Sequence, residues 1–328
     1  MDIFNIAAAL VSFVLTLFIG RFLIPELRKL RAGQSIRADG PTWHAAKEGT
    51  PTMGGIMFIL GTGVAVVALG WGEMLRGNCA HLYVYLFALA FGIIGFVDDY
   101  RKVARHQNEG LTAKQKFILQ LAAAVAFLCL MRYEGLLTDD LYVPFWNTSF
   151  RVNWIAYLVF AAFVIVGTVN AVNLTDGIDG LACSVTFLVM VFFTAVSVLW
   201  GIASVPLLPA ALSGGLAAFF FYNRHPAKVF MGDTGSLFLG GAVAALAFAL
   251  DMPLVLIPVG VVYILETLSD IIQIGYFKVT HGKRFFKMAP LHHHLELSGW
   301  SEAKIVSVFC ALTAVGCALA YWGVYHRY

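Results

Sequence analysis

Charged residues are scarce in this sequence. They make up 12% of its 328 residues, whereas hydrophobic residues make up 60%. A soluble domain carries about 25% charged residues, so the composition excludes an ordinary soluble protein and predicts an integral protein of the lipid bilayer. No long polar segment or low-complexity tract interrupts the apolar runs, and we expect a single domain over residues 1–328. The net charge of +3 is too small to indicate a nucleic-acid partner.

Cysteine motifs and targeting signals are also lacking. The five cysteines lie mostly in apolar runs and form no Cys-x-x-Cys pair, so we expect neither a disulfide nor a zinc site. The first residues, Met1-Asp2-Ile3, lack the basic region and the cleavage site of a signal peptide. We therefore expect the first apolar run to be retained.

Long apolar runs fill most of the chain. A helix that spans a bilayer needs about 20 predominantly apolar residues, and ten runs approach this length. They cover approximately Ile3–Ile24, Met53–Leu69, Leu82–Val97, Phe117–Met131, Trp154–Val169, Leu181–Trp200, Val205–Tyr222, Leu237–Leu250, Leu254–Phe277 and Ile305–Val324. The predicted fold is an all-α polytopic membrane protein of about ten transmembrane helices, with a kink at Pro258 in the ninth.

Positive charge is distributed unevenly among the connections. Seventeen of the 22 Lys and Arg residues lie on the odd-numbered connections, at residues 25–52, 98–116, 170–180, 223–236 and 278–304. Cytoplasmic loops carry an excess of Lys and Arg, so these connections are expected in the cytoplasm and both termini outside it. The longest even-numbered connection, residues 132–153, has aromatic residues and a proline, and is compatible with a small interfacial hairpin.

The connection at residues 170–180 is polar although it joins two apolar runs. Asn170, Asn173 and Asp176 are spaced three residues apart, so a continuing helix places them on one face. Asp176 and Asp179 have no Lys or Arg nearby in sequence, and a charge beside lipid costs roughly 2.5–3.5 kcal/mol at a helix centre. We interpret the stretch as part of a functional site; a polar turn between helices is the alternative.

Carboxylates also close the third run and precede the eighth. Asp98 and Asp99 are followed one turn later by Lys102, which suits a Mg²⁺–phosphate site because hard cations take oxygen ligands. Asp233 lies in the Gly-rich segment 232–236, whose backbone N–H groups are expected to bind a phosphate. The structural alternatives are an interfacial ion pair for the first motif and a helix N-cap for the second.

All these motifs lie on odd-numbered connections, which predicts one shared cytoplasmic site. If the carboxylates converge, two of them 4 Å apart repel by about 4 kcal/mol at an effective dielectric near 20. A divalent ion, nearby lysines or protonation must offset this repulsion. Lys47, Lys102 and Lys114 supply positive charge, but a diphosphate substrate would also need it. The predicted cofactor is therefore Mg²⁺.

The last odd-numbered connection contains three consecutive histidines, His292–His294. Consecutive residues point in different directions and lack the spacing of zinc ligands, so we interpret them as phosphate or sugar contacts. Packing of the loop on the membrane surface is the alternative. In the ninth run, Glu266, Asp270 and Gln273 share one helix face, which must face protein or a cavity. Gln273 is placed to reach the site, Glu266 is interpreted as a structural pair, and Phe230 is suited to stacking on a base or to packing.

Together the motifs resemble the polyprenyl-phosphate N-acetylhexosamine-1-phosphate transferase superfamily over nearly the whole chain. The superfamily pattern lies in Asp98-Asp99 with Lys102, in Asn170–Gly180 and in Gly232–Ser236. Two further motifs, Gly49–Gly55 and Pro290–His294, are similar to the phospho-N-acetylmuramoyl-pentapeptide transferase family in particular.

The resemblance implies a reaction. In this family phospho-MurNAc-pentapeptide moves from UDP-MurNAc-pentapeptide to undecaprenyl phosphate, giving lipid I and UMP, with Mg²⁺ required. This is the first membrane step of peptidoglycan synthesis, and it implies the bacterial cytoplasmic membrane, with the site facing the cytoplasm. The resemblance also implies a homodimer.

Roles for individual residues follow from the same resemblance. Asp233 resembles the Mg²⁺ ligand, and Asp98, Asp99 and Asp233 resemble the catalytic carboxylates. Residues that resemble the nucleotide and sugar pocket are Asn170, Asn173, Asp176, Asp179, Asn223, Phe230 and Gln273. Residues that resemble the polar groups around the substrate phosphates are Lys47, Thr52, Lys102, Lys114, His292 and His293.

Several alternatives remain open at this point. The lipid phosphate attacks directly, with Asp98 taking its proton, or an Asp nucleophile forms a covalent intermediate. A GlcNAc-1-phosphate transferase is a related alternative, against which the Thr50–Gly55 stretch and the histidine loop argue. A secondary transporter is an unrelated one, but transporters place buried carboxylates near the membrane midplane and often have paired repeats, which are not evident here.

Overall fold

The computed structural model describes residues 3–30, 47, 49–105 and 109–327, which are mostly helical. The helices are α1 (Ile3–Lys29), α2 (Gly55–Leu75), α3 (Ala80–Arg105), α4 (Ala113–Tyr133), α5 (Trp154–Thr175), α6 (Leu181–Leu199), α7 (Leu207–Asn223), α8 (Gly232–Ala249), α9 (Leu256–Val259), α10 (Val261–Val279), α11 (Leu291–Glu296) and α12 (Glu302–Val324). A short 3-10 turn, η2 (Pro253–Val255), precedes α9.

Each of the ten predicted runs corresponds to one helix or, for the ninth, to the broken segment η2–α9–α10. In the described chain, eight helices are long and apolar enough to cross a bilayer, and the broken segment makes a ninth if it is one span. Helix α7 is apolar but has only 17 residues. A polytopic α-helical membrane protein is therefore confirmed, while ten spans and extracytoplasmic termini stay predictions.

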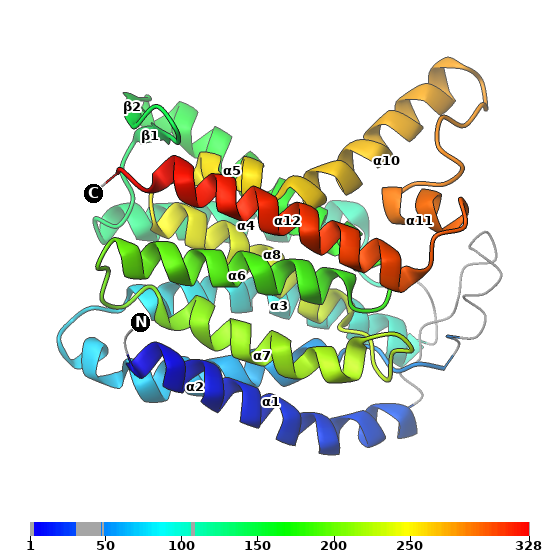
Figure 1. Cartoon of the computed structure of the whole chain (residues 1–328), viewed down its shortest axis with the longest axis horizontal. Helices are drawn as coiled ribbons and strands as arrows, with labels where there is room; N and C mark the ends of the chain where they lie inside the picture. The colour runs from blue at the N-terminus through cyan, green and yellow to red at the C-terminus, as the bar shows by residue number, and fades with distance from the viewer. Residues whose placement is uncertain (1–2, 31–46, 48, 106–108, 328) are drawn as a thin grey trace.

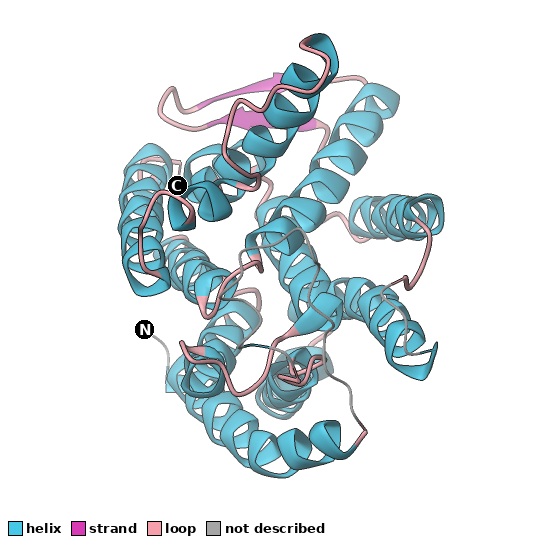
Figure 2. Cartoon of the chain, turned by 90° about the vertical axis from the view of Figure 1, so that its right-hand side faces the viewer, coloured by secondary structure: helices cyan, strands magenta, loops and turns pink. Residues whose placement is uncertain are grey.

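The polar connections lie together at one end of the bundle. The start of α1 and the end of α12 lie at the left of Figure 1, and the segments that join α5 to α6, α7 to α8 and α10 to α12 lie at the right. Figure 2 views the molecule from this right-hand end. Strands β1 (Asp140–Val143) and β2 (Thr148–Arg151) form an antiparallel hairpin at the left, where the sequence favoured an interfacial hairpin.

Helix α8 is the best-buried candidate span, because 83% of its apolar window is enclosed by the surrounding helices. Its first turn packs against α3 at Gly95, where an added Cβ would overlap the backbone of Asp233. Further along, Gly240 lies against the backbone of Val169 on α5. Glycines thus bring α8 close to both neighbours, and this close packing sets where Asp233 lies.

Helix α10 leaves the bundle (Figure 1). The chain bends by 81° between the segment Pro253–Val259 and α10. The sequence predicted a kink at Pro258, and the break comes two residues later, at Gly260, which separates α9 from α10. The bend carries the polar end of α10 and the histidine loop over the end of the bundle.

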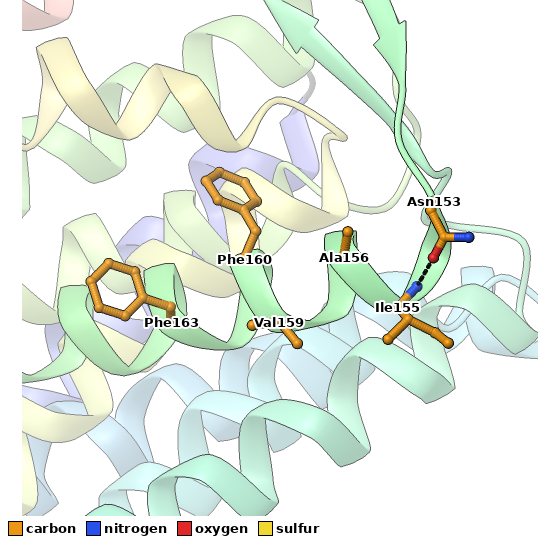
Figure 3. A pocket seen from close by; sticks show the side chains of 6 residues that line it. All are labelled: Asn153, Ile155, Ala156, Val159, Phe160 and Phe163. Carbon is orange, nitrogen blue, oxygen red and sulfur yellow. Dashed lines mark hydrogen bonds between the residues drawn. The ribbon is translucent and has the colours of Figure 1, made fainter.

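A shallow apolar groove of about 820 Å³ runs along the first half of α5 (Figure 3). Its lining residues are Asn153, Ile155, Ala156, Val159, Phe160 and Phe163. The lining is almost entirely hydrocarbon, and the polar residues of α5 lie at the opposite end of the helix. The groove therefore suits an acyl or prenyl chain and not a sugar nucleotide.

Candidate active site

Three carboxylates from two helices meet at the polar end of the bundle. Asp98 and Asp99 lie near the end of α3, and Asp233 lies in the first turn of α8. One carboxylate oxygen from each lies within 4.8 Å of the others. The side chains of Asp98 and Asp99 are buried, with 2% and 3% exposed, and that of Asp233 is partly buried, with 16% exposed. Mutual repulsion at this separation requires nearby positive charge.

Two lysines supply that charge. The Lys102 Nζ lies 2.6 Å from Asp98 Oδ2 and 2.9 Å from Asp233 Oδ2. The Lys116 Nζ lies 2.7 Å from Asp233 Oδ2 and 3.5 Å from Asp98 Oδ2. These lysines and the three carboxylates are called the carboxylate–lysine cluster below.

The sequence analysis selected Lys114, but the structure brings Lys116 into the cluster instead. Lys114 is exposed and takes no part in the ion pairs of the described residues. Two residues along a helix turn a side chain by about 200°, so only one of these lysines faces the bundle. A sequence motif that bears on this choice is the capping box at the start of α4. In it the Thr112 side chain accepts from the Gln115 N–H, and the Gln115 side chain accepts from the Thr112 N–H. The capping box fixes where α4 begins, and so which of its residues share a face.

Asp99 caps the first turn of α8 from a neighbouring helix. Its Oδ2 accepts from the Thr234 backbone N–H at 2.9 Å and from the Thr234 hydroxyl at 2.7 Å, and its Oδ1 accepts from the Asp233 N–H at 3.2 Å. The N-cap residue itself, Met231, makes no side-chain cap. The expected N-cap by a residue of the Gly-rich segment was thus wrong, and two amides expected to bind phosphate donate to Asp99 instead.

The asparagines of α5 lie on the face that the spacing predicted, because the helix continues to Thr175. The Asn173 Nδ2 donates to Asp233 Oδ1 at 2.8 Å and to Ser236 Oγ at 2.7 Å. The Asn170 Nδ2 donates to Gln120 Oε1 on α4 at 2.8 Å. Asn173 therefore orients Asp233, whereas Asn170 joins α5 to α4.

Thr52 lies beside Gly232, the first residue of α8. An added Cβ at Gly232 would lie 2.6 Å from Thr52 Oγ1 and 2.5 Å from Asp99 Oδ2. Gly232 also has a φ of +71°, which L side chains rarely adopt. A glycine at this position lets the segment around Thr52 approach the carboxylate–lysine cluster.

Asp176 follows the last residue of α5. Burial raises the pKa of Asp176 well above its usual range, and the nearby carboxylates, first that of Asp233, raise it further. The carboxylate of Asp179 acts in the same direction. The pKa of Asp176 is thus raised by carboxylates from two different parts of the site.

The second polar group, called the Lys47 cluster below, consists of Lys47, Asp179, His225 and Glu302. The Lys47 Nζ lies 2.8 Å from Asp179 Oδ1 and 2.8 Å from Glu302 Oε1. The His225 Nδ1 lies 3.0 Å from Asp179 Oδ2. Sequence reasoning found Lys47 and Asp179 but missed His225 and Glu302, which stand alone in their segments and belong to no motif.

Three other predicted pocket residues are engaged with backbone. Asn223 accepts from the Gly180 N–H at 3.1 Å and donates to the Val229 carbonyl at 3.0 Å. The Gln273 Oε1 accepts from the N–H groups of two residues of the connection after α10, and its Nε2 donates to a carbonyl there. Phe230 pairs through its backbone with the segment that precedes α2. In this structure these residues hold the connections in place.

The histidine loop docks against the broken span. The His292 Nδ1 lies 3.0 Å from Glu266 Oε2, and both side chains are fully buried. The opposite edge of the His292 ring faces Gly177, where an added Cβ would overlap it. His293 pairs with Glu296 at 2.8 Å. The interpretation of Glu266 as a structural pair is confirmed, and its partner is a residue that the sequence analysis assigned to the site.

The donor set of the carboxylate–lysine cluster fits a hard divalent cation. All three candidate ligands offer carboxylate oxygens, which Mg²⁺ prefers over nitrogen or sulfur. Such an ion would share the space now neutralised by Lys102 and Lys116. Lys47 already lies between the carboxylates of the second cluster, so we assign no ion there.

Comparisons with known proteins identify the family of the chain. The sequence profile of glycosyl transferase family 4 matches residues 81–251, and the phospho-N-acetylmuramoyl-pentapeptide-transferase signature 1 matches residues 47–59. The chain is 46% identical over 318 residues to the phospho-N-acetylmuramoyl-pentapeptide-transferase of Clostridium acetobutylicum, which covers 96% of this chain and 98% of that protein. It is 46% identical over 319 residues to the enzyme of the same name from Clostridium perfringens strain 13, covering 96% and 97% of the two chains.

The chain belongs to the phospho-N-acetylmuramoyl-pentapeptide-transferase family. The resemblance that the motifs predicted is thereby confirmed, and a secondary transporter finds no support. The family 4 profile spans the carboxylate–lysine cluster, and the family signature begins at Lys47 and includes Thr52. The histidine loop and Glu302 lie beyond both matches but within the near-complete alignment to the relatives.

Proposed function

We propose that this transferase moves phospho-MurNAc-pentapeptide from UDP-MurNAc-pentapeptide to undecaprenyl phosphate, forming lipid I and releasing UMP. The observation that carries the proposal is the carboxylate–lysine cluster, in which α3, α4 and α8 bring three carboxylates and two lysines together at one end of an apolar bundle. Family membership supplies the substrate class. The excess of Lys and Arg on the connections at this end supports a cytoplasmic site.

Each part of the cluster has a proposed role. Lys102 and Lys116 neutralise the diphosphate of the donor and the incoming lipid phosphate. Asp233 would be the main ligand of a bound Mg²⁺, which would supply charge stabilisation for the diphosphate and the leaving UMP. Asn173 fixes the orientation of Asp233 through its 2.8 Å hydrogen bond. Asp99 serves mainly to hold the start of α8.

We propose direct attack by the lipid phosphate, with Asp98 as the base. The Asp98 Oδ1 accepts from the Leu111 N–H at 2.7 Å, and its Oδ2 pairs with Lys102 at 2.6 Å. These contacts hold the Asp98 carboxylate in place beside Lys102. In the direct route Asp98 accepts the remaining proton of the phosphate, while the bond from phosphorus to UMP breaks.

The second cluster, which contains Asp179 and Lys47, is proposed to bind the nucleotide, with Asp176 between it and the reacting phosphates. The apolar groove on α5 is proposed to receive a distal part of the prenyl chain, since it is open and lined by hydrocarbon and lies toward the end of α5 opposite Asn173. We propose a homodimer on the strength of the family resemblance alone.

The test is UMP release by the detergent-solubilised protein with UDP-MurNAc-pentapeptide, undecaprenyl phosphate and Mg²⁺. The proposal predicts release that depends on both substrates. Turnover with UDP-GlcNAc but none with the muramoyl donor would change the substrate assignment. UMP exchange into the donor without any lipid phosphate would favour the covalent route. No UMP release from protein that is folded would contradict the proposed reaction.

A further inference from the structure

Glu302 lies at the start of α12, 255 residues away from Lys47 in sequence, yet the two side chains are in direct contact. The Lys47 Nζ lies 2.8 Å from Glu302 Oε1 and 2.9 Å from Glu302 Oε2. The Glu302 Oε2 also accepts from the backbone N–H of Asp179 at 3.1 Å. Glu302 therefore holds both a side chain and a main chain that the proposed function assigns to the nucleotide.

Both carboxylate oxygens of Asp179 have partners. Its Oδ1 pairs with Lys47 at 2.8 Å, and its Oδ2 accepts from the Ala227 N–H at 3.0 Å and contacts His225 Nδ1 at 3.0 Å. The exposed fraction of the Asp179 side chain is 1%, and that of Glu302 is 9%. Two buried carboxylates this close repel each other, and Lys47 lies between them and offsets the repulsion.

The Lys47 cluster is separate from the carboxylate–lysine cluster. Among the described residues, no hydrogen bond or ion pair joins Glu302 to Asp98, Asp99 or Asp233. A change at Glu302 therefore acts on Lys47, on Asp179 and on His225, whose Nδ1 lies 3.6 Å from Glu302 Oε1, and leaves the ion pairs of Lys102 and Lys116 intact. We therefore expect a change at Glu302 to alter the KM for the donor and not the KM for undecaprenyl phosphate.

We propose that Glu302 is a positioning residue for the donor nucleotide. It acts by holding Lys47 and the Asp179 backbone where the nucleotide meets them, and it does not itself touch the reacting atoms. The assignment rests on the proposed function, because it takes Lys47 and Asp179 as donor contacts. It adds a residue of α12 to the donor site.

Steady-state kinetics of Glu302→Gln test the assignment. We expect the KM for UDP-MurNAc-pentapeptide to rise roughly fivefold to tenfold, as for loss of one hydrogen bond of ordinary strength. The kcat and the KM for undecaprenyl phosphate should change by less than about twofold, because the lost contacts hold the donor equally in the ground state and in the transition state. Glu302→Asp should restore part of the donor KM, since it keeps the charge. Glu73→Gln, which removes a carboxylate from the opposite end of the bundle, is the matched control and should alter neither KM.

A double-mutant cycle with Lys47→Met tests whether Glu302 alters the donor KM through Lys47. If Glu302 acts through Lys47, the double variant should raise the donor KM by clearly less than the product of the two single effects. An unchanged donor KM in Glu302→Gln would overturn the proposal, and so would equal losses for both substrates. If Glu302→Gln does not fold, Glu302→Asp replaces it, with a raised donor KM expected and an unchanged one contradictory. Absence of UMP release by the unmodified protein would instead contradict the proposed function.

Discussion

Asp99 on α3 accepts hydrogen bonds from both the backbone N–H and the hydroxyl of Thr234 on α8, at 2.9 and 2.7 Å. One member of the adjacent carboxylate pair thus stabilises the helix that carries Asp233, while the other, Asp98, pairs with the two lysines. We therefore propose a structural role for Asp99 and a chemical role for Asp98.

Asp99→Ala should destabilise the protein by about 1–2 kcal/mol, because it leaves the first amides of α8 without an acceptor. Asp99→Asn should cost less, since its side-chain oxygen still accepts one hydrogen bond. Thermal unfolding in detergent measures both. Asp98→Asn is the comparison and should lower UMP release with a smaller loss of stability. Equal stability of Asp99→Ala and the unmodified protein would rule out the capping role.

Lys116→Met should lower kcat/KM for UMP release by at least tenfold, because two carboxylates of the cluster lose a partner within 3.5 Å. Lys114→Met should have a much smaller effect, since that side chain is exposed. The two variants remove the same charge two residues apart, so the comparison isolates position. A larger loss in Lys114→Met would show that the orientation of α4 described above is wrong.

Asp176→Asn should stabilise the metal-free protein, and more so as the pH rises. The raised pKa means that folded protein keeps the Asp176 proton at pH values where unfolded protein has lost it. Stability from this group is therefore complete below the unfolded pKa and is lost as the pH rises toward the folded pKa. Asparagine has no proton to lose, so the stability difference between the variants should widen from pH 4 upward. Thermal melts between pH 4 and 8 with a chelator measure it, and a constant difference would contradict the assignment.

Gly95→Ala should destabilise the bundle strongly, because the added methyl overlaps the backbone of Asp233, which cannot move without displacing α8. Gly72→Ala is the matched control, since Gly72 also lies in a helix but nothing lies within 4 Å of an added Cβ. That variant should be neutral or up to about 1 kcal/mol more stable, as expected for Gly to Ala in a helix. Equal melting temperatures for the two variants would show that α3 and α8 do not pack as described.

Composition and spacing predicted much of this structure. The apolar runs located the helices, and the three-residue spacing of Asn170 and Asn173 placed both on one face because α5 continues to Thr175. The predictions that failed concern residues whose positions depend on contacts between helices. The capping of α8 by Asp99 follows from how the ends of α3 and α8 meet, which local sequence does not encode. The choice of Lys116 over Lys114 needs both the start of α4, which the capping box gives, and the packing of α4 against the bundle, which it does not.

The partners of Gln273 and Glu302 were also beyond the sequence. Gln273 was expected at the substrate, but it holds the backbone of the connection that follows the 81° bend. Glu302 was missed because a single carboxylate at a helix start is ordinarily a dipole or cap residue. The contact between Glu302 and Lys47 forms only because the first and last polar connections lie at the same end of the bundle.

Asp98, Asp233 and the two lysines are proposed to form the reaction centre together with a divalent cation. Mg²⁺ titration of UMP release, for the unmodified protein and for Asp233→Asn, tests it most directly. We expect saturable Mg²⁺-dependent release by the unmodified protein and loss of that dependence in Asp233→Asn, with both proteins equally folded. Full, Mg²⁺-dependent turnover by Asp233→Asn would contradict it.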